Sequence, residues 1–449
     1  MKLFLALIVA GLGTVLIPAE TQAGGLAFNA AGNLFVADGH SISKYAPDGT
    51  KSTFAAGLKY PLGLCFDPEG NLFVSDGAVT DPKSSIFKFT PDGKRSTFAT
   101  GISSVGMACD RSGNLFVSQG DSIFKFTPKG VKSTFVISKL ANFIDLAFDG
   151  AGNLFVVDQT VTVPGLGRSI FEITPDGTKS PFATGLEDPN GLAVDGAGNV
   201  YVTVVTAADA SSHAIFKFSP NGTNSTFNSA LGAYVDRGLV VDRSGNVFVW
   251  TGHSILKVDP SGTPSTFASE WVSPDKQWEY KPWVNGHGPG IVKAATTQVV
   301  LDFSEELTFG GTGEAEIVWA PDSKRLAFNY SPPHAHHTTY ETVAFYQLRD
   351  DKWVALHSPV DEASERAQLA QLARQYSPKN TYRKGDSSPV RDNLKARSWT
   401  DANTAILYAY SAAHGGEAAA LFTLKFDAKG NLKIVKMHRL SKKELEEER

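Results

Sequence analysis

A five-residue phrase that recurs six times constrains the fold of this chain of 449 residues more than any other feature. The phrase reads Gly-Asn, then Leu or Val, then Phe or Tyr, then Val. It begins at Gly32, Gly70, Gly113, Gly152, Gly198 and Gly245, with spacings of 38, 43, 39, 46 and 47 residues. A period of about 40–50 residues, built from short apolar runs and glycine turns, is typical of propeller blades. The repeat therefore predicts an all-β fold whose main part, residues 25–269, is a six-bladed β-propeller.

Each repeat is predicted to form four strands, called a to d from the propeller axis outward. In the second repeat they are expected at residues 62–66, 72–75, 86–89 and 95–99. The a–b and c–d turns hardly change between repeats, whereas the b–c loops vary in length. Long b–c loops are expected at residues 77–85, 159–169 and 204–214. These loops share one rim with the d–a connections, and loops on a rigid frame often carry function. We therefore expect any ligand site on this rim, here called the variable rim.

The two ends of the repeat region predict how the ring closes. The first repeat has its own strand a at 25–28, and the sixth has its own strand d at 264–267. Each blade is then contiguous in sequence. We expect blades one and six to close the ring by side-chain packing, without an exchanged strand.

The composition changes after Ser269, which predicts a second domain. Six of the seven Trp and seven of the ten His residues follow this position. Trp319 and Trp399 each begin a similar stretch, which predicts two blade-like meanders separated by one helix at about 361–376. The expected segments are a linker at 270–298, a smaller β-rich (α+β) domain at 299–440 and a charged tail at 441–449.

The N-terminus predicts export. Residues 1–23 combine a positive start, an apolar run and small residues before Gly24, as in a signal peptide. We expect a periplasmic or extracellular protein with no stable membrane insertion after cleavage. The 42 basic and 46 acidic residues give a formal net charge of −4, which provides no electrostatic reason to expect nucleic acid as a partner.

The chain has two cysteines, Cys65 and Cys109, on strand a of neighbouring repeats. Their repeat positions differ by one residue, so their side chains point to opposite faces of their sheets. This is the orientation that a bridge between adjacent blades needs, and export permits a disulfide. Packed sheets lie about 10 Å apart, however, which is too far unless the pair lies near the axis. A disulfide and two separate buried thiols both remain possible, and the spacing favours the thiols.

The repeats resemble the NHL repeats and the wider regucalcin/gluconolactonase-like propeller superfamily. The phrases that carry the resemblance are PLGLCFDPEGNLFVSD at 61–76 and PNGLAVDGAGNVYVT at 189–203. The resemblance covers residues 25–269. The stretch VWAPDSKRLAFNY at 318–330 also resembles a blade of TolB-type propellers.

The gluconolactonase-like resemblance implies a lactonase with a divalent cation such as calcium or zinc at the channel mouth. In that family Asn, Asp and Glu side chains at the starts of the inner strands hold the metal, and such oxygen ligands suit a hard cation. The equivalent positions here are Gly24, Leu62, Val105, Ile144, Asn190 and Arg237. Asn190 matches the family pattern, and Asp145 and Asp236 lie one residue from equivalent positions. The apolar residues are poor ligands, and Arg237 repels a cation.

Two further groups of residues are candidate binding sites. Asp38, Asp76 and Asp158 end strand b and either form an acidic patch on the variable rim or bond local backbone where the strand turns. Local bonding is the favoured interpretation. His334, His336 and His337 are the densest set of possible metal ligands, and neutral imidazoles suit zinc or copper. The favoured alternative is a solvated loop, because no further ligand is evident from the sequence.

The sequence favours an exported, non-catalytic propeller without a cofactor that binds a protein, peptide or glycan on the variable rim. A regular scaffold, three long loops and no nucleophile motif motivate this prediction. The alternative is a metal-dependent lactonase-type hydrolase or lyase around Asn190, Asp145 and Asp236.

Overall fold

The structure is a computed structural model, and its described part forms two compact units. It describes residues 25–77, 83–102, 104, 106–138, 142–160, 168–206, 212–229, 231, 235, 238–251, 254–281, 289–294, 296, 298–303, 315–330, 342–356, 391–413 and 416–447. The first unit comprises residues 1–252 and 257–265, and the second comprises 253–256 and 266–449. The predicted signal peptide therefore lies outside the described residues.

The described strands of residues 25–269 form six four-stranded antiparallel sheets, here called blades one to six. Blades one to three consist of β1 (Leu26–Phe28), β2 (Leu34–Asp38), β3 (Ser41–Tyr45), β4 (Lys51–Ala56), β5 (Pro61–Phe66), β6 (Leu72–Asp76), β7 (Ser85–Phe89), β8 (Arg95–Thr100), β9 (Met107–Cys109), β10 (Leu115–Gln119), β11 (Ser122–Phe126) and β12 (Lys132–Ile137). Blades four to six consist of β13 (Phe143–Phe148), β14 (Leu154–Asp158), β15 (Arg168–Ile173), β16 (Lys179–Leu186), β17 (Leu192–Val194), β18 (Val200–Val205), β19 (His213–Phe218), β20 (Asn224–Asn228), β21 (Leu239–Val241), β22 (Val247–Trp250), β23 (Ser254–Val258) and β24 (Pro264–Ser269).

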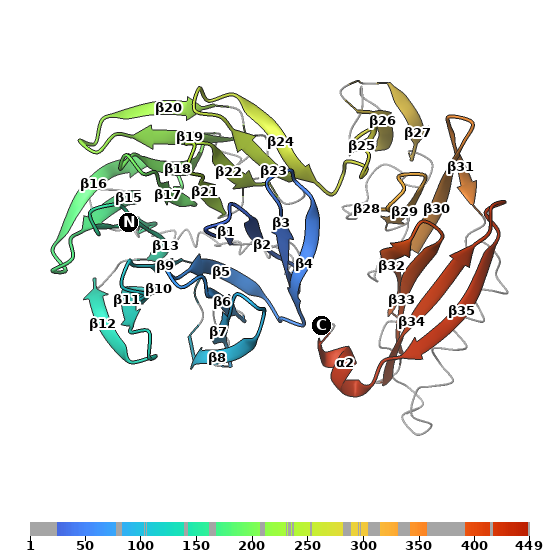
Figure 1. The fold of residues 1–449 in the computed structure, drawn as a ribbon, viewed down its shortest axis with the longest axis horizontal. Coiled ribbons are helices and arrows are strands. Elements are labelled where there is room, and N and C mark those ends of the chain that lie inside the picture. The colour runs from blue at the N-terminus through green and yellow to red at the C-terminus, as the bar shows by residue number, and fades with distance from the viewer. Residues whose placement is uncertain are drawn as a thin grey trace, which may run out of the picture. The chain divides into compact units, whose positions relative to one another are not determined.

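The innermost strands of the six blades pack side by side around one axis (Figure 1). In order these strands are β1, β5, β9, β13, β17 and β21, and β21 in turn contacts β1. Each sheet uses four consecutive strands, so no strand of the described ring is exchanged. The all-β fold class predicted from the repeat is confirmed.

The core of the propeller lies between blades, because strand b is buried on both faces. In blade one the Phe35 ring meets Phe54 of its own sheet and Phe66 of blade two, each at a centroid distance of 5.0 Å and nearly edge-on. Blade three repeats this arrangement with Phe116. Edge-to-face aromatic pairs contribute about 0.5–1.5 kcal/mol each beyond the area that they bury. The repeated Phe thus packs blade one on blade two and blade three on blade four.

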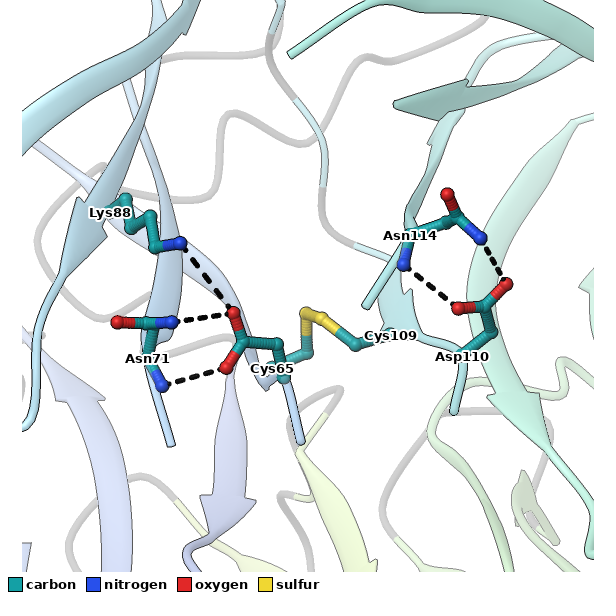
Figure 2. The surroundings of a disulfide bond; sticks show 7 residues. Cys65, Asn71, Lys88, Cys109, Asp110 and Asn114 are labelled. Atoms are coloured by element: carbon teal, nitrogen blue, oxygen red, sulfur yellow. Dashed lines mark hydrogen bonds and ion pairs between the residues drawn. A yellow bond between two sulfur atoms is a disulfide. The ribbon is translucent and has the colours of Figure 1, made fainter. Parts of the chain in front are cut away.

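The rim opposite the variable rim is built from repeated a–b turns. In blade five the Asp195 carboxylate accepts hydrogen bonds from the Asn199 backbone N–H (2.9 Å) and side-chain amide (2.7 Å). The same pair recurs at Asp110 and Asn114 (Figure 2). These aspartates are therefore turn formers.

A disulfide joins Cys65 of β5 to Cys109 of β9, with the two Cα atoms 6.1 Å apart (Figure 2). The favoured prediction of two separate thiols is therefore wrong. The spacing of about 10 Å applies to sheets packed face to face, whereas these cysteines lie on innermost strands, which converge toward the axis. The separation falls within the range that a disulfide spans.

The second unit contains three further sheets in its described part. They consist of β25 (Trp278–Lys281), β26 (Gly290–Lys293), β27 (Val299–Asp302), β28 (Glu316–Trp319), β29 (Arg325–Tyr330), β30 (Thr342–Arg349), β31 (Lys352–Leu356), β32 (Arg391–Asp401), β33 (Thr404–Ala413), β34 (Gly416–Phe426) and β35 (Leu432–Arg439). The prediction of a linker over 270–298 is corrected, because β25 and β26 pair with β27 there. Trp278, Tyr280 and Ile291 of these strands are buried, so the segment contributes to the core.

The two blade-like sheets of the second unit pack on a common core that includes Phe345, Trp399 and Phe422. The indole N–H of Trp399 donates to the Val318 carbonyl at 3.0 Å, which ties β32 to β28. The helix predicted at 361–376 lies outside the described residues. Part of the charged tail forms the helix α2 (Lys442–Glu447). In the described part of the chain, no helix has the length and apolarity needed to cross a membrane.

Candidate functional site

The aspartates that end strand b do not form an acidic patch, because their carboxylates are used locally. Asp76 is buried and accepts the backbone N–H groups of Lys59 (2.8 Å) and Tyr60 (2.7 Å). Asp38 accepts the Ser43 hydroxyl (3.0 Å) and the Lys51 ammonium (2.9 Å). Asp76 therefore bonds local backbone, whereas the Asp38 carboxylate bonds two side chains.

Asp158 is the third residue of this set and is also buried. Its Oδ1 accepts the backbone N–H of Asn142 (3.0 Å), and the Thr160 hydroxyl donates to the same oxygen (2.6 Å). The Lys179 ammonium lies 3.9 Å from its Oδ2. Burial lowers the pKa of Lys179, and the Asp158 charge offsets part of that effect. Asp76 and Asp158 therefore cap the backbone segment that leads into strand a of their own blade.

Blade five lacks this cap. Val204 stands at the position that Asp76 and Asp158 occupy, and the Val205 N–H bonds the Glu187 carbonyl at 3.0 Å. The segment 188–192, which leads into strand β17, therefore has no carboxylate from its own strand b to bind its amides.

Side chains of blade four hold this segment instead. The Gln159 amide donates to the Pro189 carbonyl (3.0 Å) and to the Asp188 carboxylate (3.3 Å). The Arg168 guanidinium lies 3.4 Å from the same carboxylate. Asp188 has a φ of 42°, in the left-handed region, which aspartate tolerates better than most residues.

Asp145 is the third blade-four residue that holds the segment. Its Oδ2 accepts the backbone N–H of Leu192 at 2.7 Å, and its Oδ1 accepts that of Leu146 at 2.9 Å. Asp145 pairs with Val157 in the sheet of blade four. Val157 and Leu192 belong to one hydrophobic core between blades four and five. Asn190 lies two residues before Leu192. The structure therefore brings Asp145 to the segment that contains Asn190.

Asn190 is the most informative residue of the segment. Its backbone N–H donates to the Thr203 carbonyl at 2.9 Å. Its side-chain Oδ1 is buried and has no hydrogen-bond partner among the described residues. Leaving a buried acceptor unpaired costs about 1–3 kcal/mol, so a ligand that donates a hydrogen bond here gains affinity.

Three more buried polar atoms on the variable rim of blades four to six lack a partner among the described residues. They are Arg168 Nε, His213 Nδ1 and Trp250 Nε1. Arg168 and His213 begin strand c, and Trp250 ends strand b, so all three are at the same rim as Asn190. In the described part of the first unit, the unpartnered buried side-chain atoms fall only on blades four to six. We call Arg168, Asn190, His213 and Trp250 the rim site.

Sequence reasoning found Asn190 but missed the other three residues of the rim site. A signal for one of them exists in the repeat. Trp250 stands where the other blades have the smaller residues Ala37, Ser75, Ser118, Val157 and Thr203. The position of His213 is also occupied by His in blades one and six, so the repeat does not single it out.

The described residues do not fit a resident metal ion. Of the positions that the family resemblance implies, Leu62 and Ile144 are buried aliphatic side chains, and Asn190 offers one oxygen. A hard cation takes six to eight oxygen ligands. Within the described residues no group of three His, Cys, Asp or Glu side chains could hold a metal. Asp236, Arg237, His334, His336 and His337 lie outside those residues.

The comparison with known families supports the superfamily predicted for the propeller. The family model described as SMP-30/Gluconolactonase/LRE-like region matches residues 79–268. This match confirms the gluconolactonase-like resemblance of the repeats. No match was found among the curated proteins.

Several solved structures are similar to the chain at low identity. Virginiamycin B lyase from Staphylococcus aureus is 12% identical with a TM-score of 0.43, covering 61% of this chain and 92% of that one. A gluconolactonase from Xanthomonas campestris is 17% identical with a TM-score of 0.31, covering 70% and 85%. A regucalcin from Agrobacterium tumefaciens is 13% identical with a TM-score of 0.36, covering 62% and 83%. At these sequence identities and TM-scores, the three solved structures carry no inference about the activity of this chain.

Proposed function

Because residues 79–268 match the SMP-30/gluconolactonase/LRE-like family, we propose that the propeller binds a small hydroxylated carbonyl compound at the rim site and hydrolyses it. A sugar lactone is the simplest compound of this class. Hydrolysis adds water across the ring ester, breaks the bond between the carbonyl carbon and the ring oxygen, and yields a carboxylate, a hydroxyl group and a proton. We further propose that the protein acts after export, with residues 1–23 removed.

The single observation that carries this proposal is the unpaired Oδ1 of Asn190. It belongs to a segment that blade four holds through Gln159, Arg168 and Asp145. A binding group that neighbouring side chains hold in place loses little entropy when a ligand arrives. A ligand hydroxyl that donates to this oxygen would satisfy it.

The other atoms of the rim site suit the rest of such a ligand. Arg168 Nε and Trp250 Nε1 can only donate hydrogen bonds, which carbonyl and hydroxyl oxygens accept. His213 Nδ1 can donate or accept, depending on its tautomer. Donors and an acceptor are thus present among the four residues of the rim site, and a polyhydroxylated lactone needs both. No step of the proposed reaction is routed through a metal.

The proposal is tested by following proton release from glucono-δ-lactone in weakly buffered indicator solution with the full-length mature protein. We expect hydrolysis above the spontaneous rate, and a loss of at least about tenfold in kcat/KM for Asn190→Leu, equal to about 1.4 kcal/mol. Asn221→Leu is the matched control, because Asn221 is an exposed residue in the c–d turn of the same blade. A wild-type protein that opens no lactone, or an Asn190→Leu variant with full activity, contradicts the proposal.

A second candidate function is non-catalytic binding of a protein, peptide or glycan on the variable rim. The observation that favours it is the length of the b–c loops at 77–85, 159–169 and 204–214. Calorimetric titration with the open-chain sugar acid and with neutral oligosaccharides separates the two candidates. Saturable binding without turnover of any lactone supports the second.

A further inference from the structure

The innermost strands of five blades share a glycine that blade four lacks. The position is defined by strand pairing. In each blade, the next residue of strand a pairs with the middle Val of strand b. The glycines are Gly25, Gly63, Gly106, Gly191 and Gly238. Blade four has Asp145 at this position.

The glycine is required where neighbouring inner strands approach closely. A Cβ atom added to Gly106 would lie 2.6 Å from the Ile144 carbonyl oxygen and 2.7 Å from the Asp145 Cα atom. Real Cβ contacts are not that short, so a side chain there needs the backbone to shift. Strand β13 has an irregular register with β14 between Phe143 and Asp145, and β5 has the same irregularity with β6 around Gly63. The aspartate thus replaces the glycine at a position where the backbone also departs from regular pairing in blade two.

The Asp145 side chain crosses from blade four to blade five. Its Oδ2 accepts the Leu192 N–H at 2.7 Å, across 47 residues of sequence. A hydrogen bond to an ionised carboxylate is stronger than one between neutral groups. Leu192 is the first residue of β17 and the last residue of segment 188–192, which carries Asn190.

The bond from Asp145 acts in a blade that lacks the cap of blades two and four. In blades two and four Asp76 and Asp158 bind the amides before strand a, whereas Val204 cannot do so in blade five. Gln159 and Arg168 hold the start of the segment at Asp188 and Pro189. Asp145 holds its end at Leu192, so Asn190 lies between two fixed points.

We propose that Asp145 is a positioning residue for Asn190, and that it fixes the Asn190 oxygen at the rim site through its bond to the Leu192 backbone. Asp145 is not itself assigned to the ligand. The identity of the ligand rests on the proposed function. The effect of Asp145 on the backbone of segment 188–192 does not depend on any ligand.

The first test measures hydrogen exchange in the ligand-free, full-length mature protein. Asp145→Gly restores the residue that the other five blades carry, so the variant is expected to fold. We expect amide exchange in segment 188–192 to become about ten- to hundredfold faster, because one charged hydrogen bond is lost. Asp145→Asn keeps an oxygen that can accept the Leu192 N–H and is expected to restore most of the protection.

Asp76→Ala is the matched control. It removes the oxygen that accepts the Lys59 and Tyr60 N–H groups on the same rim and is expected to speed exchange at those two residues, while segment 188–192 is unchanged. Unchanged exchange at 188–192 in Asp145→Gly overturns the proposal, whether or not the protein turns over any lactone.

The second test uses glucono-δ-lactone and connects the order of the segment to the site. We expect Asp145→Gly to raise KM about tenfold or more, Asp145→Asn to lie near the wild type, and Asp76→Ala to leave KM unchanged. A wild-type KM in Asp145→Gly with faster exchange at 188–192 also overturns the positioning role. If the wild type neither binds nor opens the lactone, the proposed function fails, and the exchange experiment still decides the role of Asp145.

Discussion

Cys65 and Cys109 link the innermost strands of blades two and three, 44 residues apart in sequence, through a disulfide (Figure 2). Both side chains belong to a core that also contains Phe73 and Leu115 of the two neighbouring strands b. The disulfide therefore adds a covalent link to an interface that hydrophobic packing already holds.

Removing this link is expected to destabilise the propeller. A loop of this length corresponds to about 4 kcal/mol in the chain-entropy description of disulfides. We expect the Cys65→Ala/Cys109→Ala variant to unfold at lower urea concentration than the oxidised wild type, as measured by circular dichroism. Dithiothreitol should lower the midpoint of the wild type and leave the variant unchanged. Equal midpoints for oxidised and reduced wild type would contradict the prediction.

Arg325 is expected to stabilise the second unit. It is buried, and its Nη1 donates to the Ala402 carbonyl and the Asn403 side chain at 2.7 Å each. Burial lowers the pKa of its guanidinium, but arginine stays charged in proteins. Arg325→Met removes these hydrogen bonds from a buried charged group to partly exposed acceptors, which we expect to cost about 1.5–3 kcal/mol.

Tryptophan fluorescence during thermal unfolding measures this effect, because six of the seven Trp residues follow Ser269. Lys433→Met, at an exposed position of β35, is the control and should unfold like the wild type. An Arg325→Met variant whose unfolding temperature matches that of the control would show that the bonds contribute nothing.

The N-terminus of α2 is expected to respond to acid. Hydrogen bonds from the Ser441 hydroxyl and backbone N–H, and a smaller contribution from His438, lower the pKa of Glu444 to about 2 from 4.5. Ser441 and Glu444 form a reciprocal capping box, since the Glu444 N–H also bonds the Ser441 hydroxyl. Because the folded pKa is below the unfolded one, the stabilisation is present above pH 4.5 and is lost as the pH falls toward 2.

NMR titration of the Glu444 carboxyl carbon tests this prediction. Ser441→Ala should raise the pKa toward 4.5, and His438→Gln should raise it less. A carboxyl group that still titrates near pH 2 in Ser441→Ala would disprove the capping interaction.

Removing divalent cations is expected to leave the rim site functional. The described residues offer Asn190 as a single free oxygen beside buried aliphatic residues, which do not fit a cation. We therefore expect the same KM for glucono-δ-lactone before and after dialysis against EDTA. Loss of activity that calcium or zinc restores would place a metal at the site and refute this expectation.

Much of the propeller was predictable because its signals are local. The Gly-Asn phrase marks the turn before strand b, and the Asp–Asn bonds of that turn, such as Asp195 with Asn199, span only four residues. The capping role of Asp158 was also within reach, since its partner Asn142 lies within the same repeat. The strands at 278–281 and 290–293 were missed because they fall outside any repeat.

The candidate site was only partly predictable. Asn190 was found because it matches a family pattern, whereas the bonds of Gln159 to Pro189 and of Arg168 to Asp188 join different repeats. A repeat comparison shows that Asp145 replaces a glycine, but it does not show which atom its carboxylate binds.

The sequence by itself determined the repeating sheet. The pairing of four strands follows from apolar runs and turn residues that lie within one repeat of about forty residues. Only the tertiary structure decided which side chains meet between blades. The disulfide from Cys65 to Cys109 and the bond from Asp145 to Leu192 depend on how closely the inner strands converge at the axis. That distance is set by the closure of the whole ring (Figure 1), and no single repeat contains it.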